Sequence, residues 1–136
     1  MPLDERYRYH RLDAEGKQGL IEVVRRILEE RGVTLAIIFG SFVELDSFRD
    51  IDVAVYIGPM EADLDAIFKL TAEIEEEIHI PVDVVPLESI QTKFKHYILT
   101  KGRVILEREP GLHEALIIQT IDEQILLEGK EGQRDE

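Results

Sequence analysis

Apolar positions along the chain recur with two different periods, and the change between them divides the sequence into helices and strands. From Ala14 onward the apolar residues fall three and four positions apart, which is the spacing of one face of an amphipathic helix. Gly32 follows the last of them and is a natural helix stop. The residues of this predicted inner face are Leu20, Val23, Val24, Ile27 and Leu28.

Short apolar runs predict strands between the helical stretches, because a brief run bounded by turn residues is typical of a buried strand. The segment from Gly40 to Arg49 is predicted to be a turn, and Gly58-Pro59 ends the strand that follows it. The predicted strands are Thr34 to Phe39, Ile51 to Ile57, Val82 to Val85 and Arg103 to Glu107.

Three further helices are predicted, from about Glu61 to Glu77, from Ser89 to Leu99 with a break at Gly102, and from Leu112 to Leu127. The alternation of helices and strands indicates an α/β (α+β) fold class. The residues predicted to face inward are Leu64, Ile67, Phe68, Leu70, Ile74 and Ile78 in the first of these helices, and Phe94, Tyr97 and Ile98 in the second.

Length and composition restrict the classes of protein. A chain of 136 residues, 44% of them hydrophobic, favours one domain over residues 1–136, with residues 1–12 and the polar tail 128–136 less ordered. The absence of cysteine excludes disulfides and thiolate metal sites. Because the sequence has no apolar signal segment and no membrane-length apolar run, we expect a soluble cytoplasmic protein.

The formal net charge of −13 limits the possible partners. Stable binding to nucleic acid depends on Lys and Arg that neutralise phosphates, so we expect none. A single nucleotide remains compatible with this charge, because bound metal ions mask it locally.

Three aspartates carry the candidate chemistry. Side chains alternate along a strand, so Asp50, Asp52 and Ala54 share one face and the aliphatic residues between them take the other. Two carboxylates on one face repel each other, which is relieved if they hold a hard cation such as Mg²⁺. The alternative is an exposed strand end with solvated carboxylates. Asp83 lies in another apolar strand and either joins this site or faces water from an edge strand.

Gly40-Ser41 follows the first buried strand. A glycine allows the backbone to approach a phosphate closely, and the Ser41 hydroxyl can donate to a phosphate oxygen. An ordinary turn explains these two residues equally well when they are taken alone.

In combination, these residues resemble the minimal nucleotidyltransferases of the DNA polymerase beta superfamily. The later stretch that runs from Val82 to Leu87, and then from Ile98 to Glu107, is similar to the small antitoxin-type members. The resemblance covers roughly Leu20 to Ile125 and implies a small mixed sheet flanked by helices.

The resemblance also implies roles for individual residues. Asp50 and Asp52 bind Mg²⁺ with the nucleoside triphosphate, Asp83 completes the metal site and helps to activate the acceptor hydroxyl, and Gly40 and Ser41 hold phosphate. Antitoxin-type members pair with a helical HEPN-domain toxin, and some transfer AMP from ATP to a tyrosine of that toxin.

The turn of this chain departs from the pattern of the resembled family. Eight residues, Phe42 to Arg49, separate Ser41 from Asp50 where many members have ten, and Arg49 replaces the serine before the first aspartate. Arg49 is therefore a candidate for contacting phosphate. Two alternatives to AMP transfer onto a partner stay open: a non-catalytic antitoxin that acts by binding alone, and nucleotide transfer to a small-molecule hydroxyl.

The predicted last helix carries more apolar residues than one side of a helix on a small domain usually buries. Pairs such as Ile117-Ile118 and Leu126-Leu127 widen its apolar stripe beyond a single core-facing side. An exposed apolar patch of this kind typically marks an interaction surface. We therefore expect an oligomer, formed with a second copy or with a helical partner. The alternative is that this helix lies buried between the sheet and another helix.

Overall fold

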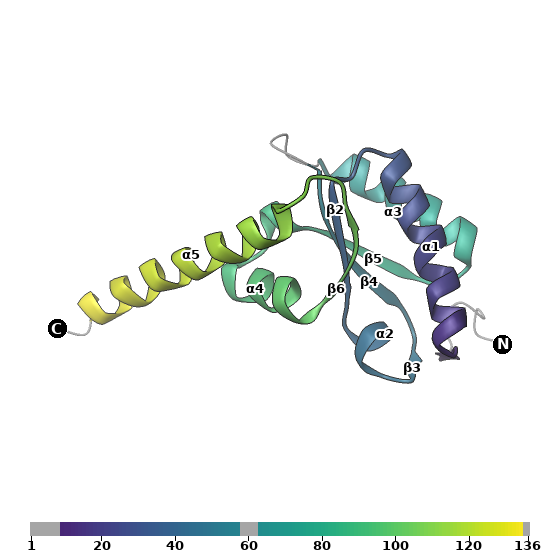
Figure 1. The fold of residues 1–136 in the computed structure, drawn as a ribbon, viewed down its shortest axis with the longest axis horizontal. Helices are drawn as coiled ribbons and strands as arrows, with labels where there is room; N and C mark the ends of the chain where they lie inside the picture. The colour runs from purple at the N-terminus through teal and green to yellow at the C-terminus, as the bar shows by residue number, and fades with distance from the viewer. Residues whose placement is uncertain (1–8, 58–62, 135–136) are drawn as a thin grey trace.

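A computed structural model describes residues 9–57 and 63–134 of the chain (Figure 1). Helices and strands alternate along most of it. The helices are α1 (Ala14–Glu30), α2 (Ser41–Glu44), α3 (Leu64–Ile78), α4 (Thr92–Lys101) and α5 (Leu112–Arg134), with a 3-10 helix η2 (Leu87–Ser89). The strands are β1 (His10–Arg11), β2 (Leu35–Phe39), β3 (Ser47–Phe48), β4 (Ile51–Tyr56), β5 (Val82–Pro86) and β6 (Arg103–Glu107).

Four of the strands form a mixed sheet in the order β5-β4-β2-β6. The central strand β2 is antiparallel to β4 and to β6, whereas β4 and β5 are parallel. Parallel neighbours need a crossover connection, and α3 supplies it between β4 and β5. The predicted α/β class with a small mixed sheet is confirmed.

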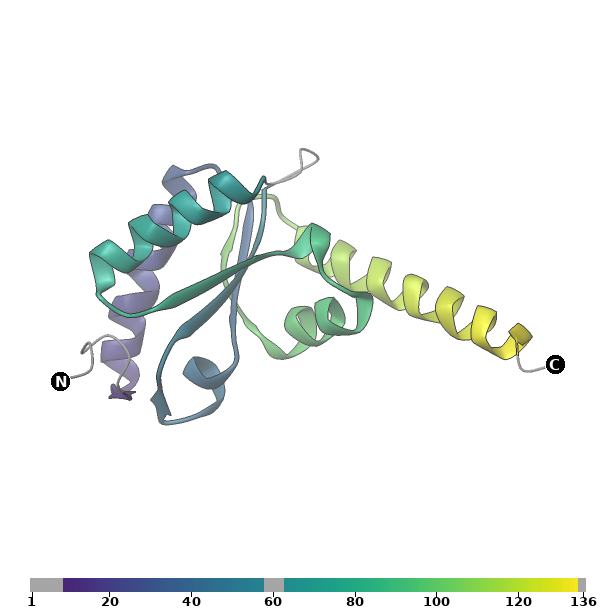
Figure 2. The ribbon, with the colours of Figure 1, turned by 180° about the vertical axis from the view of Figure 1, so that it is seen from behind.

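Helices cover both faces of this sheet (Figures 1 and 2). On one face α1 and α3 pack against Ile51, Val53 and Val55 of β4, so the aliphatic side of that strand points inward as predicted. On the other face α4 and the start of α5 pack against the opposite side of β2 and against Ala54. The alternation of β4 therefore directs Asp52 to the α4 face.

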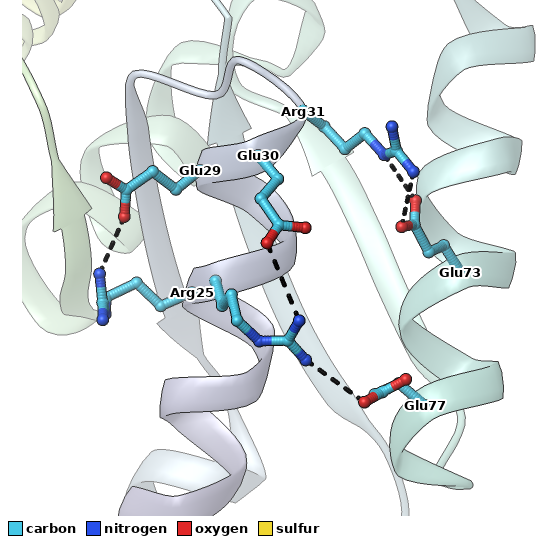
Figure 3. A network of polar contacts seen from close by, with 7 residues as sticks. Arg25, Glu29, Glu30, Arg31, Glu73 and Glu77 are labelled. Carbon is cyan, nitrogen blue, oxygen red and sulfur yellow. Dashed lines mark hydrogen bonds and ion pairs between the residues drawn. The ribbon is translucent and has the colours of Figure 1, made fainter.

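Surface ion pairs join α1 and α3, which lie side by side (Figure 3). The Arg31 guanidinium donates to both oxygens of Glu73 at 2.8 Å, and Arg26 lies 3.3 Å from Glu77. Exposed pairs of this kind each contribute roughly 0–1 kcal/mol. Most of the stabilisation between α1 and α3 therefore comes from the apolar face of α1 and the buried residues of α3.

Two aspartates fix the starts of the long helices. The Asp13 carboxylate accepts from the Gly16 amide at 2.8 Å, and Asp63 accepts from the Ala66 amide at 2.7 Å, which satisfies a free amide in each first turn. Capping by Asp63 starts α3 at Leu64. The predicted earlier start at Glu61, together with the Gly58-Pro59 break, lies outside the described residues.

Four residues predicted to face inward are exposed instead. In α3 the buried stripe consists of Ile67, Leu70 and Ile74. Phe68 is exposed because it follows Ile67 and lies about 100° round the helix from it, and Leu64 is exposed at the first position of the helix. In α4 the residues Phe94 and Tyr97 are exposed, while Ile98 is buried as predicted. Apolar type alone did not identify the inner face.

A short strand and a long helix lie near the two ends of the described chain. Residues His10 and Arg11 form β1 and pair with β3. Helix α5 continues to Arg134, and its last half extends beyond α4 (Figures 1 and 2). None of the helices in the described ranges combines the length and apolar character needed to cross a membrane.

Candidate functional site

The parallel pair β4 and β5 brings two of the three candidate aspartates together. Asp52 and Asp83 are direct partners in the register of these strands. Neighbouring partners on one sheet point to the same face, so both carboxylates lie on the side covered by α4. Asp50 directly precedes the first residue of β4, and its negative charge raises the pKa of Asp52. The structure thus gathers the three predicted carboxylates at one end of the sheet.

Asp52 is the half-buried member of the group. Burial raises its pKa to about 6, and the charges of Asp50 and Asp83 add to this rise. Asp50 and Asp83 are both exposed. A carboxylate that is desolvated beside two others favours protonation or a bound cation, since either one removes the repulsion.

Gly40 ends β2 beside this carboxylate. Its backbone adopts φ 79° and ψ −153°, a conformation that essentially only glycine tolerates. A Cβ at this position would lie 2.6 Å from Oδ2 of Asp52, so any side chain would collide with the carboxylate. The glycine that the sequence singled out therefore leaves the space next to Asp52 open.

A cavity of about 650 Å³ has Asp50 in its lining. It contains three of the residues predicted from the sequence, and its size is in the range of small-molecule sites. Asp52, Asp83 and Gly40 are not among its lining residues. Its lining includes Tyr9, Ser41, Leu45, Arg49, Asp50 and Pro81.

The segment between Ser41 and Asp50 is held in place by Lys17 of α1. The Lys17 ammonium donates to the carbonyl oxygens of Phe42 at 2.7 Å and Leu45 at 2.8 Å. It also lies 5.2 Å from the Phe42 ring centroid and 5.8 Å from that of Phe48. Sequence reasoning missed Lys17 and Tyr9, because their partners are distant in the chain.

The donor set fits a hard divalent cation that is completed by substrate. Within the described ranges, no three His, Asp or Glu side chains gather closely enough to form a ready metal cage. Mg²⁺, however, commonly uses one or two carboxylates together with substrate phosphates and water. Asp50 and Asp52, with their mutual repulsion, provide such a pair.

The sequence leaves two possibilities open for Asp83: membership of the site with Asp50 and Asp52, or a position facing water on an edge strand. Strand β5 is an edge strand of the sheet and Asp83 is exposed, which agrees with the second possibility. Burial therefore gives no support for a role of Asp83, and its place beside Asp52 is the observation that remains.

A small mixed sheet with aspartates on neighbouring strands, next to a Gly-Ser strand end, defines the class of nucleotidyltransferase folds. The model of the Polymerase beta, Nucleotidyltransferase family matches residues 22–111, well over half of the 136-residue chain. The chain belongs to this family. No curated protein sequence matches it.

Solved structures share the fold at low sequence identity. A chain in the crystal structure of the toxin–antitoxin MntA–HepT superposes with a TM-score of 0.70 and 21% identity, covering 85% of this chain and 93% of that one. A chain in the crystal structure of the toxin–antitoxin with AMP-PNP superposes with a TM-score of 0.73 and 22% identity. The match covers 83% of this chain and 93% of that one. A chain in the structure of the tri-AMPylated Shewanella oneidensis HEPN toxin in complex with MNT antitoxin superposes with a TM-score of 0.72 and 22% identity. The match covers 86% of this chain and 93% of that one.

Proposed function

We propose that the protein transfers AMP from ATP to a hydroxyl of a HEPN-type helical partner protein. The observation that carries the proposal is the pairing of Asp52 in β4 with Asp83 in β5. Asp50 directly precedes the first residue of β4. Family membership supports nucleotidyl transfer. The nature of the acceptor is suggested by a fold neighbour that was solved with a tri-AMPylated HEPN toxin.

In the proposed reaction, the acceptor oxygen attacks the α-phosphorus of ATP. A new phosphorus–oxygen bond forms, the bond to the bridging oxygen of the β-phosphate breaks, and pyrophosphate leaves. Asp50 and Asp52 would hold Mg²⁺, which supplies positive charge to the phosphate oxygens when bound. Asp83 is exposed, so it is open to an incoming hydroxyl and can accept its proton.

The cavity beside Asp50 would receive the triphosphate. Arg49 is the only cation among its described lining residues, and the Ser41 hydroxyl supplies a donor for phosphate. Gly40 keeps side-chain atoms away from the Asp52 carboxylate. Together these residues would bind and orient the nucleotide at the end of the sheet.

The decisive experiment uses ATP labelled at two different positions. The protein is incubated with Mg²⁺, a HEPN-domain protein as the candidate acceptor, and ATP labelled at either the α- or the γ-phosphate. We expect label on the partner from α-labelled ATP only, and none with the Asp52→Asn variant. Label from γ-labelled ATP indicates phosphoryl transfer, and an unlabelled partner in all samples contradicts the proposal.

Non-catalytic neutralisation is the second candidate function. The exposed apolar side of α5 favours it, because it offers a surface for binding. Growth of cells that express the partner separates the two functions. If Asp52→Asn neutralises the partner as well as the unchanged protein does, binding alone is sufficient.

A further inference from the structure

The N-terminal strand β1 lies against the segment that leads to Asp50. It pairs antiparallel with β3, with His10 opposite Phe48 and Arg11 opposite Ser47. The His10 and Phe48 rings also contact each other, with centroids 5.7 Å apart. In an antiparallel ladder, the position that follows His10 and Phe48 is occupied by Tyr9 and Arg49. Backbone pairing therefore brings these two residues together.

Their side chains interact directly. The guanidinium carbon of Arg49 lies 5.4 Å from the centroid of the Tyr9 ring, within the range of a cation–π contact. Both residues line the cavity that also contains Ser41 and Asp50. Tyr9 is 68% exposed, so burial in the core does not account for its position.

The charges around the cavity indicate what the contact between Tyr9 and Arg49 could do. The chain carries a net charge of −13, and Asp50 in the cavity lining repels a triphosphate. Arg49 is the only cation among the described lining residues, and it is exposed. A free arginine side chain loses conformational entropy when a ligand orders it. Contact with an aromatic ring restricts the guanidinium before the ligand arrives.

We propose that Tyr9 is a positioning residue for nucleotide binding, which holds the Arg49 guanidinium at the cavity so that it can bind the triphosphate. The proposal rests on the proposed function, because it assigns the ligand of the same site. Strand β1 has a corresponding role, since its pairing with β3 ends at His10 and Phe48, the residues next to Tyr9 and Arg49.

A double-mutant cycle tests the proposal on the full chain. The dissociation constant of MgATP is measured by titration calorimetry for the unchanged protein, Tyr9→Leu, Tyr9→Phe, Arg49→Gln and the Tyr9→Leu/Arg49→Gln double variant. We expect Tyr9→Leu to bind roughly two- to fivefold more weakly, and Tyr9→Phe to bind normally because it keeps the ring. In the Arg49→Gln background, loss of the Tyr9 ring should have no further effect.

Two controls separate positioning from general damage. Phe68 on α3 is 67% exposed and does not line the cavity, so Phe68→Leu should leave the MgATP affinity unchanged. The dependence of affinity on salt should weaken in Arg49→Gln, which removes the guanidinium charge. It should weaken less in Tyr9→Leu, which leaves that charge but no longer holds it at the cavity. A purely structural role of Tyr9 would not change that dependence.

The outcomes distinguish this proposal from the proposed function. Normal MgATP affinity in Tyr9→Leu, or an undiminished effect of Tyr9→Leu in the Arg49→Gln background, overturns the role of Tyr9. If Asp52→Asn abolishes binding in the same experiment, the nucleotide site itself stands. If the unchanged protein does not bind MgATP at millimolar concentration, the nucleotide site and the role of Tyr9 both fail.

Discussion

At the scale of single residues, the charge of Asp52 should be visible in the stability of the protein. Its pKa is raised to about 6 in the folded state, compared with about 3.9 in an unfolded chain. Between these values the folded state binds more protons, so stability falls as the pH rises from about 4 through about 6. Asparagine does not titrate and avoids this loss.

We therefore predict that Asp52→Asn raises the melting temperature of the ligand-free protein at neutral pH. The advantage should be small near pH 4, grow as the pH rises through about 6, and then stay constant. Thermal melts across this range without divalent ions measure it. If the melting temperatures of the two proteins change with pH in parallel, ionisation of Asp52 does not destabilise the folded state, and the prediction is wrong.

Gly40 gives a second prediction at the residue scale. Gly40→Ala should lower the free energy of unfolding by about 1–3 kcal/mol, because alanine is strained in this backbone region. Its Cβ would also collide with Asp52 Oδ2, so MgATP binding should weaken as well. Urea denaturation and calorimetry measure the two effects.

The matched control is Gly19→Ala in α1, where an added Cβ meets no atom within 4 Å. Alanine in a helix interior is more favourable than glycine by up to about 1 kcal/mol, so this variant should be more stable than the unchanged protein. Equal effects of the two substitutions would contradict the argument from geometry.

At the scale of elements, the segment from Ser41 to Phe48 depends on Lys17. Replacing this lysine by methionine keeps the aliphatic stem but removes two hydrogen bonds from a charged donor, each worth about 1.5–3 kcal/mol. We predict faster hydrogen exchange of the Glu44 and Leu45 amides, which bond within α2. Amides of the β2–β4 ladder serve as the internal control, and their exchange should change less.

The dependence on Lys17 also explains what the sequence did not predict. Strands β2, β4 and β5 were predicted because their apolar runs are local signals, and the aspartates were placed by alternation along a strand. Helix α2 and strand β3 were read as one turn, because they are stabilised by Lys17 and by pairing with His10 and Arg11, more than 20 positions earlier. The cavity, to which Tyr9 contributes, was missed for the same reason.

Helix α5 carries the prediction about association. Its outer residues Ile118, Ile121, Ile125, Leu126 and Leu127 are exposed, as the broad apolar stripe suggested. The acidic residues Asp122 and Glu128 are also exposed along the helix, which favours a partner with basic residues round an apolar centre over a second acidic copy.

We predict that a variant with both Ile118→Ser and Ile125→Ser loses association with the HEPN-domain partner, while its melting temperature is nearly unchanged because both residues are exposed. Light scattering of the protein alone and with the partner measures this. Leu64→Ser on α3, also at an exposed position, is the control. Strictly monomeric particles in both samples of the unchanged protein would refute the interaction surface.

At the scale of the whole molecule, ligand binding should stabilise a protein whose acidic groups repel one another. MgATP bound only to the folded state adds about 2.7 kcal/mol at a concentration one hundred times its dissociation constant. We predict a clear rise in melting temperature at millimolar MgATP, which Asp52→Asn abolishes. An unchanged melting temperature would argue against nucleotide binding.

The strand order β5-β4-β2-β6 also bears on how the chain is assembled during translation. All three aspartates have been synthesised by the end of β5 at Pro86, yet β2 then still lacks its second neighbour, because β6 begins only at Arg103. Every residue of β2 is buried in the finished protein. Until the ribosome has released β6, this apolar edge is open to pairing with other chains. A chain that stops before Arg103 would therefore carry every candidate catalytic group and still be prone to aggregate.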